Sequence, residues 1–332
     1  MAYKSLKGFS GWGQLGILLL FIGVGFILAA IAQLIITLKM LPAGVSPMSS
    51  PDVILKLMLA PENIGLARLL QVISTFLLLF IPAVAFTFIT IGKKYFWLGF
   101  NKYIHIYQVV LASVIIFFAG IAAGPLEDIT KSLVAHFPAF NAHALHLEEV
   151  YNQQALALSN LKSWPEFIIA IFIMAFFPAM FEEVFFRGTL QNLFVRWWKN
   201  PMAAILVTAI IFSLIHMSVY LFLSRALLGF VLGMLYQQSK NIWVNIFAHF
   251  LNNFLALASI FYTIHTKGKV NMEDVDPNYN WWISMAALAI LIVAFWLFNK
   301  VSLQNRARIN AKENVLIAAQ NPFGSIANSE QQ

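Results

Sequence analysis

The feature that most constrains this chain is a series of apolar runs, each about as long as a membrane is thick. The first run, residues 15–38, contains no charged side chain, and comparable runs recur along most of the chain. The hydrocarbon core of a bilayer is roughly 30 Å thick, and about 20 helical residues cross it. Because lipid offers the backbone no hydrogen bonds, runs of this length predict α-helices that satisfy their own amides.

We expect eight such segments, and therefore an all-α fold: a polytopic transmembrane helical bundle of about eight spans. The fifth and sixth segments lie in one apolar stretch, which we divide near residues 218–224 because a single helix of that length would overshoot the membrane. Residues 1–300 should form a single transmembrane domain, and residues 301–332 a polar, mobile cytoplasmic tail. The expected spans are residues 12–38, 66–91, 104–124, 165–187, 202–218, 223–239, 242–264 and 280–299.

Composition supports the same class of protein. Hydrophobic residues make up 60% of the 332 residues and charged residues 11%, whereas soluble domains average roughly 45–50% and about 25%. The chain has no cysteine, which excludes disulfides, thiolate zinc ligands and a catalytic cysteine. The net charge of +7 comes from basic residues scattered between apolar runs. We therefore expect the lipid bilayer, and no nucleic acid, as a partner.

The distribution of basic residues predicts an orientation. When successive loops are assigned to alternate sides, most Lys and Arg residues fall on the side that holds both chain ends. The positive-inside rule then predicts an integral protein of the plasma (inner) membrane with both termini in the cytoplasm. The longest loop on the outer side is expected at about residues 125–163.

Two carboxylates lie well inside an apolar run, the adjacent Glu182 and Glu183. An ionisable group within a span costs roughly 3 kcal/mol, so such groups are candidates for function. Arg187 follows Glu183 by four residues, in the order that favours a same-face ion pair on a helix. This pair gives Glu183 a structural partner and leaves Glu182, about 100° around the helix, facing elsewhere.

Polar residues in two further spans are expected at a similar depth. If the fourth and fifth spans form a hairpin that turns at Lys199, Glu182 and His216 each stand 17 residues from the turn. In the seventh span, His249 and Asn253 are four residues apart and share a face. They lie roughly 12–18 Å along that span. The spacing therefore predicts that three helices converge on one buried polar pocket.

Each motif taken alone also fits a structural role. An intramembrane histidine can be a hydrogen-bonded packing residue, and a Glu–Arg pair can serve stability only. The joint occurrence of two carboxylates, an arginine, two histidines and an asparagine at matching depth favours a functional pocket over this interpretation.

Three motifs on successive apolar helices, Glu-Glu-x-x-x-Arg, Phe-x-x-x-His and His-x-x-x-Asn, follow one another within about 72 residues. They consist of Glu182, Glu183 and Arg187, then Phe212 and His216, then His249 and Asn253. In this ordered set the chain resembles the CPBP family of membrane proteases (CAAX protease and bacteriocin-processing, or Abi), which includes the type II CAAX prenyl endopeptidase. Residues 1–160 and the tail carry no part of the resemblance.

The resemblance implies an intramembrane glutamic endopeptidase with its catalytic core at about residues 165–264. Glu182 is expected to be the general base that activates a water together with His216. His249 and Asn253 would stabilise the oxyanion, with Asn252 a less favoured alternative because it lies off the His249 face. Glu183 and Arg187 would orient the site, and Phe212 would pack. The expected substrate is a membrane-proximal or lipidated peptide or protein.

Two alternatives remain open at this level. The same protease could be zinc-dependent, with Glu182, His216 and His249 as ligands and an open fourth position. The helix signature His-Glu-x-x-His is absent, and we favour a site without a metal or other cofactor. The protein could also be non-catalytic, as a transporter or as a bacteriocin-immunity or scaffold factor, because buried Glu, Arg and His residues also occur in carriers. The lack of an inverted repeat counts against a carrier.

Overall fold

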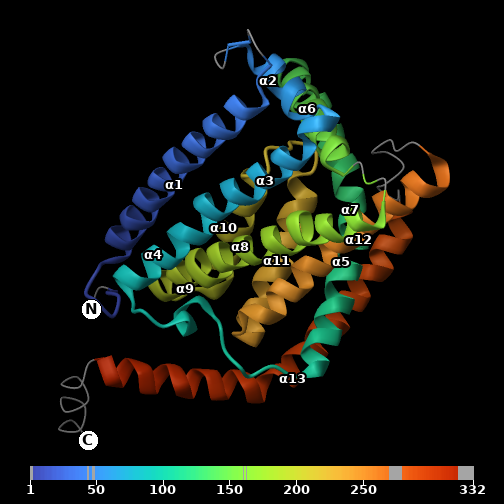
Figure 1. Ribbon diagram of the computed structural model, residues 1–332. Coiled ribbons are helices and arrows are strands. Elements are labelled where there is room, and N and C mark those ends of the chain that lie inside the picture. The colour runs from blue at the N-terminus through green and yellow to red at the C-terminus, as the bar shows by residue number, and fades with distance from the viewer. Residues whose placement is uncertain are drawn as a thin grey trace, which may run out of the picture.

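Helices make up nearly all the regular structure in the computed structural model, and the described part of the chain forms no β-strand. This confirms the prediction of an all-α, polytopic bundle (Figure 1). The residues that the structure describes are 3–42, 45–46, 49–159, 161, 163–268 and 279–320.

The helices fall into long rods and short connecting turns. The α-helices are α1 (Gly11–Met40), α2 (Pro51–Met58), α3 (Ile64–Thr75), α4 (Ile81–Thr90), α5 (Ile106–Ala135), α6 (Pro138–Leu158), α7 (Trp164–Ala170), α8 (Phe177–Phe185), α9 (Asn192–Trp198), α10 (Pro201–Leu214), α11 (Phe222–Ser239), α12 (Ile242–Lys267) and α13 (Trp281–Gln320). The 3₁₀ turns are η1 (Pro61–Asn63) and η3 (Tyr95–Leu98), and the wider π-helical segments are η2 (Phe76–Phe80), η4 (Ile171–Phe176) and η5 (Phe186–Gln191).

Six helices of the described chain are long and apolar enough to cross a membrane, and each overlaps one of the expected spans. They are Gly11–Met40, Pro61–Thr90, Ile106–Ala135, Trp164–Trp198, Ile242–Lys267 and Trp281–Ala319. The other two expected spans correspond to α10 and α11. The 14 residues of α10 rise only about 21 Å, less than the thickness of the hydrocarbon core. The helix α10 is therefore too short to cross the membrane core by itself.

The hairpins that bring the motif helices together are built by short polar turns. Lys199 ends α9 in a left-handed conformation (φ 54°), and the side chain of Asn200 then caps α10 by accepting from the amide of Ala203. Between α11 and α12, Lys240 is also left-handed (φ 52°), and the side chain of Asn241 caps α12. A side-chain cap supplies the hydrogen bond that a first-turn amide lacks, so these sequences fix where each helix starts.

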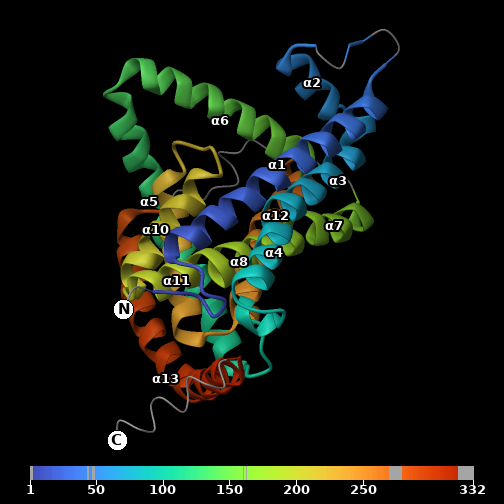
Figure 2. The same cartoon turned by 90° about the vertical axis from the view of Figure 1, so that its left-hand side faces the viewer.

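Two apolar clusters hold the motif helices between them. One joins α5 to α11, α12 and α13 through small and branched residues such as Ala119, Ile115 and Leu235. The other joins α1 and α4 to η5, α9 and α10 around Phe86 and Phe186. Figures 1 and 2 show α8, α10, α11 and α12 between the α1–α4 side and the α5–α13 side. The polar motifs therefore lie where both clusters meet.

The segment expected as a long outer loop, residues 125–163, is mostly helical. The helix α5 continues to Ala135, and α6 follows as a second rod that crosses the end of the bundle opposite to the second half of α13 (Figures 1 and 2). The guanidinium of Arg68 in α3 donates to the carbonyl of Leu158 at 2.9 and 2.7 Å, which fixes the far end of α6. The sequence pattern did not predict this helix because α6 is too polar to be recognised as a span, and α6 is not among the described helices that are long and apolar enough to cross a membrane.

The prediction of a mobile tail from residue 301 also needs correction. The helix α13 runs unbroken through residue 320, whereas residues 321–332 lie outside the described part. Ser302 and Asn305 are buried and both hydrogen-bond the side chain of Gln108 in α5. Forty helical residues span about 60 Å, twice the membrane core. Accordingly, α13 bends and its second half runs beneath the bundle (Figures 1 and 2).

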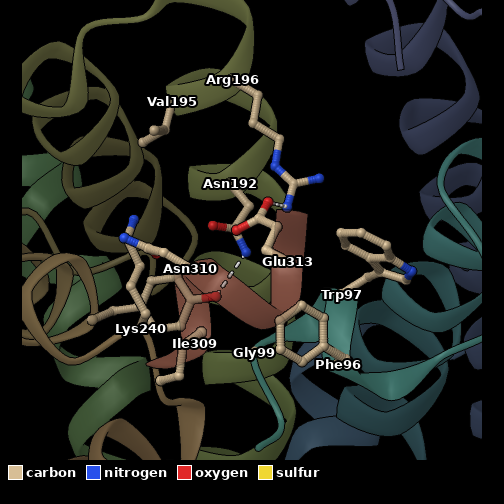
Figure 3. A pocket seen from close by; sticks show the side chains of 11 residues that line it. Phe96, Trp97, Gly99, Asn192, Val195, Arg196, Lys240, Ile309, Asn310 and Glu313 are labelled. Carbon is tan, nitrogen blue, oxygen red and sulfur yellow. Dashed lines mark hydrogen bonds and ion pairs between the residues drawn. The ribbon is translucent and has the colours of Figure 1, made fainter. Parts of the chain in front are cut away.

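The second half of α13 closes one side of a cavity of about 230 Å³ at this end of the bundle (Figure 3). An ion pair between Arg196 and Glu313 (2.9 Å) crosses the cavity from α9 to α13. Lys240 lies in the α11–α12 turn beside it, and burial lowers the pKa of this lysine to about 8. The cavity is lined by none of the motif residues.

Candidate active site

The first motif lies on one continuous helical rod, Trp164–Trp198. Within this rod the nine residues of α8, which carry both glutamates, are flanked by the π-helical segments η4 and η5. Each π turn is wider than an α turn and rotates the residues that follow it, and such segments often occur at functional sites. Arg187 lies in η5 and Glu183 in α8, so the predicted four-residue pair crosses the junction between the two geometries.

Glu183 is the centre of the buried hydrogen-bond network. Its Oε1 accepts from Nη1 of Arg187 at 2.6 Å and from Nδ1 of His249 at 2.8 Å, and its Oε2 accepts from Nδ2 of Asn245 at 3.1 Å. The side chains of Glu183 and Arg187 are completely buried. A buried charge is tolerated only when it is paired and hydrogen-bonded. The structure thus places Glu183 and Arg187 as the predicted pair, and it ties that pair to α12.

The same network is anchored to α11 through two glycines. Nη2 of Arg187 donates to the carbonyl of Gly229 at 3.0 Å. A Cβ at Gly229 would lie 3.1 Å from the Phe212 ring, and a Cβ at Gly233 would lie 2.7 Å from Cγ2 of Ile205. The spacing of small residues therefore allows α11 to approach α10 closely. That approach brings a backbone carbonyl within reach of the buried guanidinium.

Glu182 has a different environment from its neighbour. Its Oε2 lies 3.7 Å from Nε2 of His249 and 4.0 Å from Nε2 of His216, and its side chain is 13% exposed. This oxygen is buried and makes no hydrogen bond with any described residue. Leaving a buried acceptor without a hydrogen bond costs free energy, so its presence points to a role in function rather than in stability. The structure brings Glu182, His216 and His249 together as the spacing predicted.

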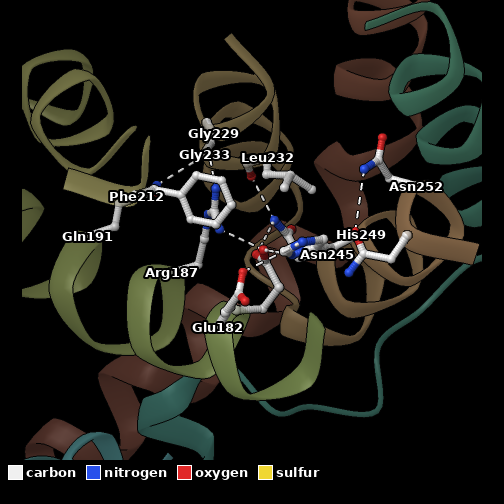
Figure 4. Close-up of polar contacts among 12 residues, drawn as sticks. Glu182, Arg187, Gln191, Phe212, Gly229, Leu232, Gly233, Asn245, His249 and Asn252 are labelled. Carbon is white, nitrogen blue, oxygen red and sulfur yellow. Dashed lines mark hydrogen bonds and ion pairs between the residues drawn. The ribbon is translucent and has the colours of Figure 1, made fainter. Parts of the chain in front are cut away.

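The hydrogen bonds of the two histidines fix which ring atoms face Glu182. Nδ1 of His216 lies 2.7 Å from the carbonyl of Phe212, and Nδ1 of His249 lies 2.8 Å from the Glu183 carboxylate. Because both partners can only accept, each Nδ1 is assigned as the N–H donor. Both Nε2 atoms then carry lone pairs toward the carboxylate of Glu182, and Figure 4 shows His249 and Glu182 directed at each other. Three acceptor atoms converge, an arrangement suited to a molecule that donates protons.

Phe212 forms one wall of this small volume. Its ring centroid lies 4.8 Å from that of His216 and 5.9 Å from that of His249. The guanidinium carbon of Arg187 lies 4.9 Å from the same ring. The aromatic ring limits access of solvent, which strengthens the electrostatic interactions within the site. These ring contacts fit the packing role that was expected for Phe212.

His216 lies beyond the end of α10 and not within it. The predicted span reached residue 218, whereas α10 ends at Leu214, and residues 215–221 form a turn in which Met217 is left-handed (φ 55°). Oγ of Ser213 donates to the carbonyl of Phe222 at 2.6 Å, which closes the turn. Irregular backbone at membrane depth is stable where it is enclosed by protein or lines a cavity. The turn therefore frees the His216 ring to reach Glu182.

Asn253 is the one predicted site residue that the structure does not bring into the network. It lies one turn beyond His249 on α12, and the one side-chain hydrogen bond that it makes within the described chain is a long one, 3.5 Å, from the neighbouring Asn252. Figure 4 shows Asn252 itself turned away from Glu182. Both amides are only partly buried. Within the described chain, neither asparagine hydrogen-bonds a glutamate or a histidine of the site.

The sequence reasoning missed Asn245. Its Nδ2 donates both to Glu183 and to the carbonyl of Leu232 at 2.7 Å, and it is completely buried. A signal was present, because Asn245, His249 and Asn253 repeat every four residues and so share one face of α12. The polar stripe extends one turn further than the family motif.

Within the described chain, no group of three or more His, Asp or Glu side chains has the arrangement of a metal site. The residues of the zinc alternative, Glu182, His216 and His249, are separated at their nearest atoms by 3.7 and 4.0 Å.

The comparisons with known proteins concern this same region. Residues 164–255 match the family model for type II CAAX prenyl endopeptidase Rce1-like proteins, which confirms the resemblance inferred from the motifs. The match runs from α7 into α12 and contains all three motifs. Comparison with curated proteins and with solved structures finds no match. The chain is thus an integral membrane protein with a region typical of CAAX-type proteases.

Proposed function

We propose that this protein is an intramembrane endopeptidase of the CAAX-prenyl-protease type, in which Glu182 and His216 activate a water for attack on a peptide bond. The observation that carries the proposal is the Glu182 carboxylate oxygen, which is buried, lacks a hydrogen bond among the described residues and faces two imidazole Nε2 atoms. Atoms 3.7 to 4.0 Å apart can share one bridging water. Geometry of this kind is what general-base catalysis requires.

The proposed reaction proceeds through addition and elimination. The water oxygen bonds to the scissile carbonyl carbon while its proton passes to Glu182, and the carbonyl oxygen becomes an oxyanion. The carbon–nitrogen bond then breaks, and the departing amine takes the proton back from Glu182. His216, whose Nε2 also faces the water position, accepts a hydrogen bond from the water and orients it. The products are a carboxylic acid and an amine, and transfer of the acid's proton then gives a carboxylate and an ammonium ion.

The oxyanion requires donors, and α12 is placed to supply them. Glu183 accepts from Nδ1–H of His249, so Nε2 is the atom that His249 presents to substrate. This role requires the imidazolium form of His249, in which Nε2 has taken up a proton from solvent before substrate binds, so that it can donate to the developing oxyanion. Asn253 lies on the same face one turn further on, and we propose that its amide adds a second donor when substrate is bound.

The proposed substrate is a membrane-proximal or lipidated peptide, with a prenylated tail as the first class to test. The site lies among helices long and apolar enough to cross a membrane. A lipid attached near the scissile bond would hold a peptide at that depth. We also propose the plasma (inner) membrane with cytoplasmic termini, which the charge distribution supports.

Cleavage of a fluorogenic farnesylated peptide by purified protein in lipid nanodiscs tests the proposal. Wild type should cleave it, and Glu182→Ala and His216→Ala should reduce the rate by roughly 10²–10⁴-fold. Glu127→Ala is a matched control, because this carboxylate pairs with Lys131 on α5 outside the site. Normal cleavage by both site variants would refute the mechanism. If wild type cleaves none of a panel of peptides, lipidated or not, the result would favour the non-catalytic alternatives.

Chelation separates the proposed mechanism from its zinc-dependent version. The proposed mechanism predicts that chelators leave the rate unchanged. Loss of cleavage with 1,10-phenanthroline, restored by added Zn²⁺, would instead assign Glu182, His216 and His249 as ligands of a catalytic zinc ion.

A further inference from the structure

The cavity between α9, η3, the end of α11 and α13 carries positive charge that the protein does not neutralise. The charged residues in its lining are Arg196 on α9, Lys240 in the α11–α12 turn and Glu313 on α13, and two cations with one anion give a net charge of +1. Arg196 and Glu313 pair with each other at 2.9 Å. Lys240 makes no ion pair within the described chain, where its Nζ donates to the side-chain oxygen of Gln237 at 2.8 Å. The cavity therefore holds one cation without an anionic partner.

The surroundings of Lys240 disfavour its charge. Burial lowers the pKa of this lysine to about 8; the carboxylate of Glu313 opposes this shift, whereas the guanidinium groups of Arg196 and Arg306 add to it. Its Nζ also lies 6.0 Å from the centroid of the Tyr236 ring. A cation removed from water costs free energy unless an anion accompanies it. An anion in the cavity supplies the partner that Lys240 lacks.

Further donors line the same space. The hydroxyl of Tyr236 accepts from Nδ2 of Asn192 at 2.7 Å, and its own proton has no acceptor among the described residues. Arg196 uses one of its five N–H donors within the described chain, in the pair with Glu313. Figure 3 shows Arg196, Asn192 and Lys240 on the walls of the cavity. Donors that approach from several directions match the three or more acceptor oxygens of a tetrahedral phosphate group better than the two oxygens of a planar carboxylate.

The space is large enough for an anion of several atoms. Its volume of about 230 Å³ is several times the roughly 30 Å³ that one water occupies. Gly99 keeps part of this volume open, because a Cβ at its left-handed position (φ 91°) would lie 2.7 Å from the hydroxyl oxygen of Tyr236. The absence of a side chain here leaves the hydroxyl accessible from the cavity.

The cavity lies at the level where lipid phosphate groups are found. The helices α9 and α11 both end beside it, at Lys199 and Lys240. Trp198, the last residue of α9, is 38% exposed, and indole side chains favour the membrane–water interface. The second half of α13, which closes the cavity, exposes Arg308 and Lys312. Exposed basic residues on a helix at this level are typical of contact with anionic lipid.

We infer that this cavity binds a phosphate ester group, held by Lys240, Arg196 and the hydroxyl of Tyr236. A phosphodiester carries one negative charge, which cancels the net charge of the lining. The headgroup of an anionic lipid and a soluble phosphate ester both present this group. A bound phosphate joins α9, the α11–α12 turn and α13, so it stabilises the folded protein. The site is independent of the proposed protease activity, because none of the motif residues lines the cavity.

Thermal unfolding of the full-length protein in an uncharged detergent at pH 7 tests the site. The probe is glycerophosphoglycerol, a soluble phosphodiester, and NaCl at equal ionic strength is the reference. A saturating probe should raise the melting temperature of wild type by roughly 3–6 °C, because a ligand that binds the folded protein alone stabilises it. Lys240→Gln should lose this shift. Lys240→Arg keeps the charge and should keep most of the shift, which separates loss of the cation from damage to the turn.

Lys199→Gln is the matched control. Lys199 ends the neighbouring helix in the same left-handed conformation (φ 54°, against 52° for Lys240). It is exposed and does not line the cavity. This variant removes the same charge from the same end of the bundle, and it should keep the full shift.

Native mass spectrometry distinguishes the two sources of the phosphate group. Protein released from nanodiscs of mixed phosphatidylglycerol and phosphatidylcholine should retain phosphatidylglycerol if a lipid headgroup occupies the cavity. Lys240→Gln should then retain less of this lipid than wild type, and Lys199→Gln should retain as much. A thermal shift with glycerophosphoglycerol but without lipid retention would support the site and assign it to a soluble ester.

Three outcomes would overturn the inference. Equal shifts with glycerophosphoglycerol and with NaCl would show that ionic strength alone acts on the protein. A shift in Lys240→Gln as large as in wild type would place the binding outside this cavity. An equal loss in Lys240→Gln and Lys199→Gln would attribute it to diffuse surface charge.

Discussion

The two adjacent glutamates should respond in opposite ways to the same chemical change. Glu182→Gln and Glu183→Gln each replace a carboxylate by an amide of nearly equal size, one residue apart on α8. Glu183 accepts hydrogen bonds from three side chains, whereas the buried oxygen of Glu182 accepts none. We therefore expect the first variant to lose activity and the second to lose stability.

The magnitudes follow from the buried ion pair. Glu183→Gln leaves the charge of Arg187 uncompensated in a site where both side chains are completely buried. Breaking such a pair costs roughly 3–5 kcal/mol, which lowers a melting temperature by roughly 5–15 °C. Glu182→Gln removes a carboxylate without a hydrogen-bonding partner, so its free energy of unfolding should stay within about 1 kcal/mol of wild type. Its cleavage rate should fall by roughly 10²–10⁴-fold.

The stability and the activity of each variant can be measured on the same purified sample. Thermal unfolding in detergent is followed by the fluorescence of the nine tryptophans, and cleavage is measured below the lowest melting temperature. A second substitution that removes the other charge, Glu183→Gln with Arg187→Gln, should recover part of the lost stability. The reasoning fails if Glu183→Gln melts within about 2 °C of wild type, or if Glu182→Gln is destabilised as much as its neighbour.

Three further predictions concern other parts of the molecule. Burial lowers the pKa of Lys240 from 10.5 to about 8, so between these pH values the unfolded chain holds a proton that the folded protein has released. The melting temperature should therefore rise from pH 8 to 10.5, and Lys240→Met should abolish that rise. Gly188→Ala places a Cβ 2.6 Å from a backbone carbonyl and should cost roughly 1–3 kcal/mol in unfolding free energy, whereas Gly16→Ala meets nothing within 4 Å and should not destabilise. The chain has no cysteine, so in intact cells an impermeant maleimide should label Asp52→Cys and spare Lys93→Cys; the reverse pattern would contradict cytoplasmic termini.

Much of the candidate site could be predicted from the sequence because its members sit at helical intervals. Glu183 and Arg187 are four residues apart on one rod, and the structure pairs them. The equal spacing of Glu182 and His216 from the turn at Lys199 placed them at one depth, and their nearest atoms are 4.0 Å apart. Intervals along a regular helix convert directly into height and direction, which is why these expectations needed no tertiary information.

The remaining features depend on departures from regular helix. The π turn of η5, the left-handed Met217 and the bend of α13 have no clear signature in a pattern of apolar residues. Arg225 resembled an ordinary residue at a span end until the fold placed it against the carbonyl of His216. Such positions are set by which helices pack together, and that packing is a property of the whole bundle.

The sequence by itself determined that the chain is a membrane-embedded helical bundle and that a few polar residues share one depth within it. Each span must satisfy its own backbone hydrogen bonds in lipid, and the length of an apolar run reflects the thickness of the hydrocarbon core. Only the tertiary structure decided how the two glutamates differ. Glu183 accepts hydrogen bonds from Arg187, His249 and Asn245, whereas the buried oxygen of Glu182 accepts none from the described residues and faces Nε2 of two histidines. Adjacent residues on a helix point about 100° apart, and what each one meets depends on the neighbouring helices.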